Sequence, residues 1–157
     1  MLAAIRPDDW NFPLLLHVLG ASILLGALIT AATAQLLAWK SRSPADVLPL
    51  ARLSFRTLLF VAIPAWFLMR IAGEWVASKG WNDVEPEQAW LGIGYITAEA
   101  GGLLLLISTI LAGIGARRLG RSSGEQGATL VRVATVLAVL LVIAYVIAVW
   151  AMSAKPV

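Results

Sequence analysis

The chain has 157 residues, of which 60% are apolar and only 13% are charged. Soluble domains average about half apolar and about a quarter charged residues, so this composition indicates a membrane protein. The sequence contains no cysteine, which excludes disulfides, thiolate nucleophiles, iron–sulfur clusters and cysteine metal sites. The net charge of +3 does not indicate a nucleic-acid partner, because the basic residues flank apolar segments and form no separate basic surface.

Four apolar segments are each long enough to cross the hydrocarbon core as a helix, which takes about 20 residues. They run from about 13–39, 57–77, 89–116 and 128–153. Lipid offers the backbone no hydrogen-bonding partner and the apolar runs do not alternate with polar residues, so helices are expected rather than strands. The sequence predicts an all-α integral membrane protein, a single domain built as an antiparallel four-helix bundle in the lipid bilayer.

Local signals refine the helix boundaries. Ser43-Pro44 indicates the start of a short helix before the second segment, with proline at the first helical position. The run Ser122-Ser123-Gly124-Glu125 has the pattern of a capping box, so the fourth helix is expected to begin before its apolar part. Pro64 lies inside the second segment and is expected to kink it.

Lysine and arginine predict the orientation. Eight of them lie in or beside the connections between the first and second and between the third and fourth segments: Lys40, Arg42, Arg52, Arg56, Arg117, Arg118, Arg121 and Arg132. The opposite side carries only Arg6, Lys79 and Lys155. Because basic loops remain on the cytoplasmic side, we expect these eight in the cytoplasm and both termini outside.

Ionisable residues occur in three of the four segments at similar depths. With a rise of about 1.5 Å per residue, Arg70 lies about 10 Å and Glu99 about 15 Å below the outer ends of their helices. A charge placed so deeply costs roughly 2.5–3.5 kcal/mol on the insertion scale. We therefore expect Arg70 to pair with Glu74 one turn away and with Glu99 across helices. His17 is expected to bond Glu74, and this cluster to face the bundle interior.

Small residues indicate where the helices approach one another closely. One stripe of the third segment carries Gly92, Tyr95, Glu99, Gly102 and Gly113. Gly20 begins a comparable face in the first segment. The glycines are expected at helix contacts. Tyr95, on the stripe of Glu99, is expected to join the polar cluster.

Two cofactors are compatible with His17. Met69 and Met152 can join it as soft copper ligands. As the only histidine of the chain, it can also supply one axial ligand to a haem, or share a haem between two chains. Each feature has a structural alternative, because an Arg–Glu pair can simply fix helix register, a histidine can be a packing residue and methionine commonly fills core gaps.

Short motifs at both ends of the chain resemble a bacterial family. They are Leu15-Leu16-His17-Val18-Leu19-Gly20-Ala21 with Gly26, then Arg117-Arg118-Leu119-Gly120, and the ending Lys155-Pro156. The family is that of predicted integral membrane proteins, domain-of-unknown-function family 2269. The resemblance implies a four-span fold in the bacterial inner (plasma) membrane and implies no activity. The first segment is more distantly similar to the membrane domain of copper-resistance protein D, which would imply metal movement through His17.

Taken together, these features predict a non-enzymatic membrane protein whose outer polar cluster binds a small solute, proton or metal ion, with transport as one use. A structural or interaction subunit of a membrane complex or a homo-oligomer is the first alternative. A haem-binding redox component is the second. Hydrolytic chemistry is not expected, because the sequence offers no nucleophile–base pair and no set of several metal ligands.

Overall fold

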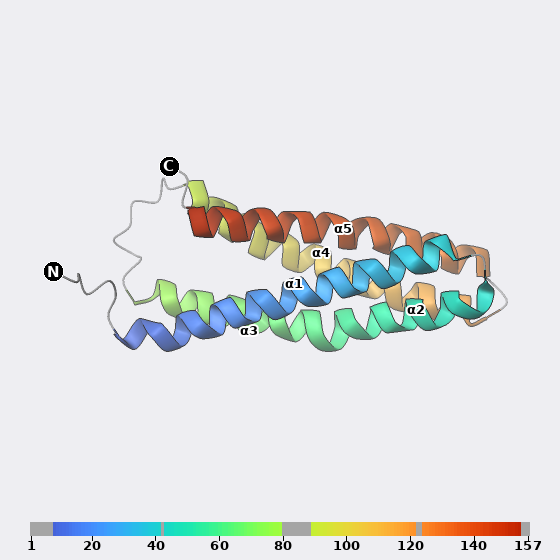
Figure 1. Cartoon of the computed structure of the whole chain (residues 1–157), viewed down its shortest axis with the longest axis horizontal. Coiled ribbons are helices and arrows are strands. Elements are labelled where there is room, and N and C mark those ends of the chain that lie inside the picture. The colour runs from blue at the N-terminus through green and yellow to red at the C-terminus, as the bar shows by residue number, and fades with distance from the viewer. Residues whose placement is uncertain (1–7, 42, 80–88, 122–123, 155–157) are drawn as a thin grey trace.

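A computed structural model describes residues 8–41, 43–79, 89–121 and 124–154 of the chain. The elements are a 3₁₀ turn η1 (Asp8–Trp10), α1 (Asn11–Lys40), α2 (Pro44–Thr57), a π-helical turn η2 (Leu58–Ala62), α3 (Ile63–Ala77), α4 (Ala89–Leu119) and α5 (Gly124–Ala154). They form one elongated bundle (Figure 1), and the described residues contain no strand. The end where α1 begins and α5 ends is called the terminal end, and the opposite one the basic end.

The second span is one continuous helix made of α2, η2 and α3. The sequence predicted a short helix at Ser43-Pro44 and a separate span from about residue 57. The structure instead carries helical geometry without a break from Pro44 to Ala77. The π-helical turn η2 directly precedes Pro64. Because proline lacks the N–H that the preceding turn would bond, a wider turn at this point relieves the backbone.

Four helical segments are long and apolar enough to cross a bilayer: Asn11–Lys40, Ala45–Ala77, Ala89–Leu119 and Glu125–Ala154. Each extends beyond the apolar run from which it was predicted. The fourth helix begins at Gly124, before its apolar part, and Ser122 and Ser123 of the expected capping box lie outside the described residues.

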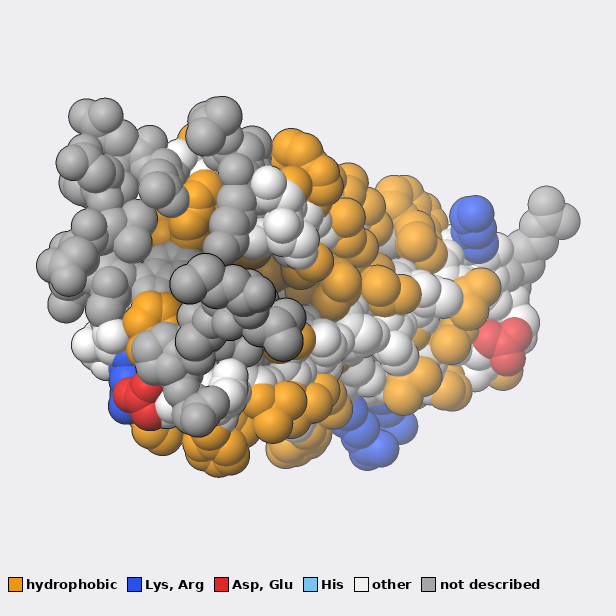
Figure 2. All heavy atoms as spheres, turned by 60° about the vertical axis from the view of Figure 1, so that its left-hand side comes forward, with side chains coloured by type: hydrophobic (Ala, Val, Ile, Leu, Met, Phe, Trp, Pro, Cys, Tyr) orange, Lys and Arg blue, Asp and Glu red, His pale blue; other side chains and the backbone are white. Residues whose placement is uncertain are grey.

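On the face shown in Figure 2, many hydrophobic side chains are exposed between the two ends of the bundle. Among them, Phe60 is 69% and Ile96 70% exposed. A soluble monomer rarely leaves so extended an apolar surface in water, whereas lipid accepts it. Trp75 and Trp150 are exposed near the terminal end, where a belt of amphipathic rings suits the lipid headgroups. The apolar exterior and the four long helices confirm the predicted all-α membrane bundle.

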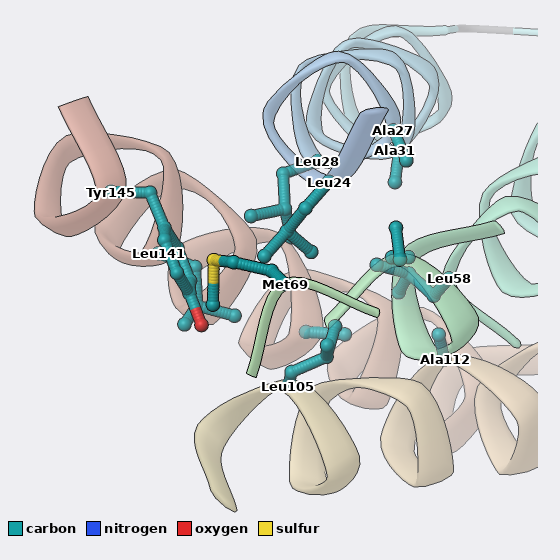
Figure 3. Close-up of a cluster of buried hydrophobic side chains, with 13 residues drawn as sticks. Leu24, Ala27, Leu28, Ala31, Leu58, Met69, Leu105, Ala112, Leu141 and Tyr145 are labelled. Carbon is teal, nitrogen blue, oxygen red and sulfur yellow. The ribbon is translucent and has the colours of Figure 1, made fainter. Parts of the chain in front are cut away.

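The core is formed where all spans meet in the middle of the bundle. Leu24 and Leu28 of α1, Leu58 of η2, Leu105 of α4 and Leu141 of α5 are almost completely buried. Figure 3 shows these side chains converging between the helices, together with Met69 and Tyr145. Their packing closes the centre of the bundle.

The helix pairs do not pack equally. α5 lies along α4, and α1 lies along α2 and α3, whereas α3 and α4 touch at few places. α1 also packs on α5, which joins these two layers on that side. The backbones of α3 and α4 approach each other at few places, and the side chains of Trp66 and Arg70 cross the seam between them.

Three of the four glycines singled out in the sequence lie at close helix contacts. A Cβ atom on Gly20 would stand 2.6 Å from the backbone nitrogen of Met69. On Gly102 it would meet the Trp66 ring and on Gly113 the Phe55 ring. The expectation for Gly92 was wrong: this residue is exposed, and no described atom lies within 4 Å of the position of its Cβ. Gly92 lies on the outer side of α4. The face of α4 that packs on α5 carries Gly94 and Gly101 instead.

The Gly20 contact gives a test of the packing between α1 and α3. We expect Gly20→Ala to lower the free energy of unfolding by about 1–3 kcal/mol, because the obstructing atoms belong to the backbone and cannot rotate away. Gly26 of the same helix has open space around it and supplies the control. Gly26→Ala should leave that free energy unchanged or raise it by up to about 1 kcal/mol, since alanine favours the helix and nothing obstructs its methyl group. Denaturant unfolding in detergent measures both, and equal effects of the two substitutions would contradict the packing described here.

Candidate functional site

Arg70 joins α3 to α4 near the terminal end. Its Nε and Nη2 donate to Oε1 of Glu99 at 2.9 and 2.6 Å. Its Nη1 donates to Oε1 of Glu74, one turn further along α3. The guanidinium also lies over the ring of Tyr95, 5.5 Å from its centroid, within reach of a cation–π attraction. The structure thus brings together four of the five residues predicted for the polar cluster.

The two carboxylates of the cluster do not face the bundle interior, and that part of the expectation was wrong. The side chains of Glu74 and Glu99 are 51% and 62% exposed, and that of Arg70 is 24% exposed. The reason is the orientation of α4, which packs chiefly on α5. Its buried face in this half carries Gly94 and Gly101. The side chain of Glu99 therefore points outward along the seam between α3 and α4.

His17 is held by the backbone and not by Glu74, which corrects the predicted partner. Its Nδ1 lies 2.8 Å from the carbonyl oxygen of Met69. Gly73 makes room for the ring, since a Cβ there would stand 2.9 Å from Nδ1. The histidine therefore packs against α3 beside the residue that precedes Arg70.

This contact fixes the tautomer of a neutral His17. A carbonyl oxygen only accepts hydrogen bonds, so the proton must be on Nδ1. In the neutral ring Nε2 then carries a lone pair that can accept a hydrogen bond or ligate a metal. Anchoring one ring nitrogen on a backbone carbonyl is also how proteins orient histidine ligands.

A cavity of about 120 Å³ lies between the four spans at the terminal end. Most of its lining is apolar, and His17, Arg70 and Tyr95 supply the polar groups. The lining residues are Leu14, His17, Met69, Arg70, Gly73, Val76, Ala77, Leu91, Gly94, Tyr95, Ala98 and Met152. The volume is comparable with that of an engineered protein cavity of 150 Å³ that binds benzene. A small ring or the end of an alkyl chain therefore fits.

All three predicted copper ligands, His17, Met69 and Met152, line this cavity. The sulfur of Met69 lies beside Leu141 and Tyr145 in the apolar core (Figure 3). Met152 packs its terminal methyl on Gly94. These are the surroundings of methionines that fill space. Among the residues that the structure describes, no group of three or more His, Asp or Glu side chains could hold a metal.

No motif or spacing singled out several residues of the cavity in advance. Gly73 and Gly94 leave the space that His17 and Met152 occupy. Ala98 lines the wall, and its carbonyl accepts a hydrogen bond of 2.9 Å from Nε1 of Trp66. Small residues in an apolar helix look alike in sequence whether they border a neighbour or a cavity. The one available signal was their position, within a turn of Arg70, Tyr95 or Glu99 on helices already expected to meet.

The geometry predicts unequal roles for the two carboxylates. Glu99→Gln should lower the free energy of unfolding by about 1–2 kcal/mol, near the upper end of measured interhelical polar contacts in membranes. Glu74→Gln breaks only a pair within α3 and should cost about 0.5 kcal/mol or less. A double-mutant cycle with Arg70→Gln should give a larger coupling for Glu99 than for Glu74. Equal couplings would show that Arg70 does not tie the two helices together.

Comparison with known proteins identifies a family. The model of the family described as predicted integral membrane protein (DUF2269) matches residues 14–156. No curated protein and no solved structure matches the chain. The matched range contains the four spans except the first three residues of the first one, and it includes Arg70, both glutamates, His17 and every residue that lines the cavity. The chain therefore belongs to the DUF2269 family of predicted integral membrane proteins.

Proposed function

We propose that the protein is non-enzymatic and binds a small molecule or ion in the cavity at its terminal end. One observation carries the proposal: His17, Arg70 and Tyr95 line a single, mostly apolar cavity between the four spans. A concave apolar site with a few convergent polar groups is the usual form of a small-molecule site. Because membrane helices associate largely through van der Waals packing, an unfilled space among them forfeits contacts that a ligand can supply.

The charge distribution supports an orientation for this site. We propose that the protein lies in the bacterial inner (plasma) membrane, with the terminal end outside and the basic loops in the cytoplasm. Lys40, Arg117, Arg118 and Arg121 are at the ends of helices that meet at the basic end, where positively charged loops are retained. The ligand would then be taken up from the outer side or the outer leaflet.

Binding is favoured over transport by a single chain. Below the cavity, Leu28 and Leu58 are 0% exposed and Leu105 is 1% exposed. A packed layer of this kind leaves no path through the middle of the bundle. Passage would need a second copy or a different arrangement of the helices.

An interaction subunit or homo-oligomer is the second candidate function, and the exposed carboxylates favour it. Glu74 and Glu99 project from the side of the bundle at a level where lipid would otherwise surround them. Charged groups within spans normally face protein or water. A protein partner, or a second copy, would cover them at the seam between α3 and α4.

Copper and haem remain predictions tied to His17. Its Nε2 is the nitrogen that would bind either metal, since Nδ1 is engaged by Met69. An absorbance spectrum of the purified protein tests haem through the Soret band, and elemental analysis tests copper. A colourless, metal-free preparation would contradict both the haem and the copper prediction.

The proposed site is tested by filling it. Ala98 lines the cavity, whereas Ala100 of the same helix is exposed on the outer surface, so Ala98→Leu and Ala100→Leu form a matched pair. Thermal unfolding in detergent is followed with benzyl alcohol, indole, benzoate and copper(I). At least one of these should raise the melting temperature of the wild type and of Ala100→Leu by several degrees, and that of Ala98→Leu by much less.

The matched pair separates binding from effects on the detergent, because both variants experience the same micelle. If all four additives shift the two variants equally, the cavity is not a binding site and the proposal fails. Light scattering of the same preparations tests the second candidate. A mass of one 16.7 kDa chain in the micelle would contradict self-association, and a larger mass lost in Glu99→Gln would support it.

A further inference from the structure

Resting on the proposed function, we infer that the ligand is a neutral amphipathic molecule. It has an apolar body and a hydroxyl-bearing head, and it enters from the bilayer along the seam between α3 and α4. The inference follows from four properties of the cavity: its wall, the hydrogen-bonding state of His17, the remaining N–H groups of Arg70 and the net charge of the cluster.

The wall selects an apolar body. Leu14, Val76, Leu91, Ala98 and Met152 present only hydrocarbon or thioether groups to the space. The three polar lining residues lie at one level of the bundle. His17 bonds the backbone carbonyl of Met69, and Arg70, which follows Met69 in the chain, stacks on the ring of Tyr95. A ligand therefore meets polar groups at one point only.

His17 requires a donor from the head. With the proton of the neutral ring on Nδ1, Nε2 can only accept. No hydrogen bond to Nε2 is formed within the part of the chain that the structure describes. A hydroxyl meets this requirement, whereas a ketone, an ether or an ionised acid does not.

Arg70 offers donors to the same head. A guanidinium has five N–H groups. Its Nε–H and one N–H of each terminal nitrogen point to Glu74 and Glu99. One N–H on each terminal nitrogen remains, and Arg70 lines the cavity. A hydroxyl oxygen can accept from such a group while its hydrogen goes to His17.

The net charge of the cluster argues against an anionic head, and the position of its carboxylates argues against a cationic one. Arg70 is already matched by two carboxylates, so an anion entering the cavity gains no unbalanced positive charge. A cation would lie beside the guanidinium, which lines the cavity, while Glu74 and Glu99 lie outside the lining. In a medium of low dielectric both charged heads would lose hydration without a matched partner. A neutral head avoids this cost.

The sparse contact between α3 and α4 provides the route. These helices touch at few places, and the cavity is lined from both by Val76 and Tyr95 among others. Tyr95 is 40% exposed, so its ring extends from the cavity wall to the outer surface. Because the Arg70–Glu99 pair spans the seam, an amphipathic molecule in the surrounding leaflet enters on the terminal side of that pair, beside Val76 and Tyr95, with its head toward Arg70.

The test uses photoreactive probes with one dodecyl chain and different heads, applied to the full chain in lipid nanodiscs. The heads are a hydroxyl, a sulfonate, a trimethylammonium and a plain methyl end. Labelling of cavity residues is mapped by mass spectrometry. The alcohol should label Leu91, Ala98 or Met152 at least fivefold more than the sulfonate or the ammonium probe. Its labelling should persist in Ala100→Leu, fall in Ala98→Leu and be displaced by unlabelled dodecanol.

His17→Phe tests the head directly, because it removes the acceptor and keeps a ring of similar shape. The preference for the alcohol over the methyl-ended probe should fall about fivefold, as expected for one lost hydrogen bond. The comparison of heads on the wild type needs no variant, so it stands even if His17→Phe does not fold.

The outcomes separate this inference from the proposed function. Equal or stronger labelling by a charged head, still abolished in Ala98→Leu, would overturn the neutral head while the cavity remained a binding site. If every probe labels the protein and none of this labelling falls in Ala98→Leu, the inference of an amphipathic ligand in the cavity is overturned. The additives that test the proposed function include compounds without a chain, so that proposal is judged by a separate result.

Discussion

The ion pair between Arg70 and Glu99 is the constraint on which the terminal half of this bundle depends. α3 and α4 make few contacts with each other, and membrane helices have little hydrophobic force to bring them together. Two hydrogen bonds from one guanidinium, at 2.9 and 2.6 Å, span the seam, in addition to the bond from Trp66 Nε1 to the Ala98 carbonyl. A charge-assisted contact of this kind fixes the separation of two helices without requiring their side chains to interdigitate. The cavity at the terminal end lies beside this pair.

The shape of that cavity depends on glycines as much as on polar residues. Gly20 brings α1 against the backbone of Met69, which places His17 within bonding distance of the Met69 carbonyl. Gly73 accommodates the imidazole and Gly94 the end of Met152. Each absent side chain thus lets a functional group or a wall residue take a defined position. Close helix approach and an open site occur together here. The helices pack tightly within each layer, whereas the backbones of α3 and α4 approach each other at few places.

Much of the fold could be predicted from the sequence, and the site could be predicted in part. Long apolar runs specify spanning helices because lipid leaves the backbone no other solution, and the cost of charges in lipid correctly linked Arg70 to Glu74 and Glu99. The rotation of α4 could not be predicted, since glycine and alanine occur on several of its faces and the pattern is nearly equally apolar all round. This ambiguity led to the wrong interior placement of Glu99 and the wrong packing role for Gly92. The partner of His17 was missed because a backbone carbonyl leaves no trace in sequence.

The most direct test measures the separation of α3 and α4. The chain has no cysteine, so cysteines introduced at the exposed positions Ile71 and Ile96 can be spin-labelled without interference. Pulsed electron–electron double resonance in nanodiscs should give a narrow distribution of distances between the two spin labels, both in the otherwise unchanged protein and in Glu74→Gln. In Glu99→Gln we expect the distribution to broaden and shift to longer distances. An unchanged distribution in Glu99→Gln would contradict the claim that this ion pair holds the two helices around the cavity.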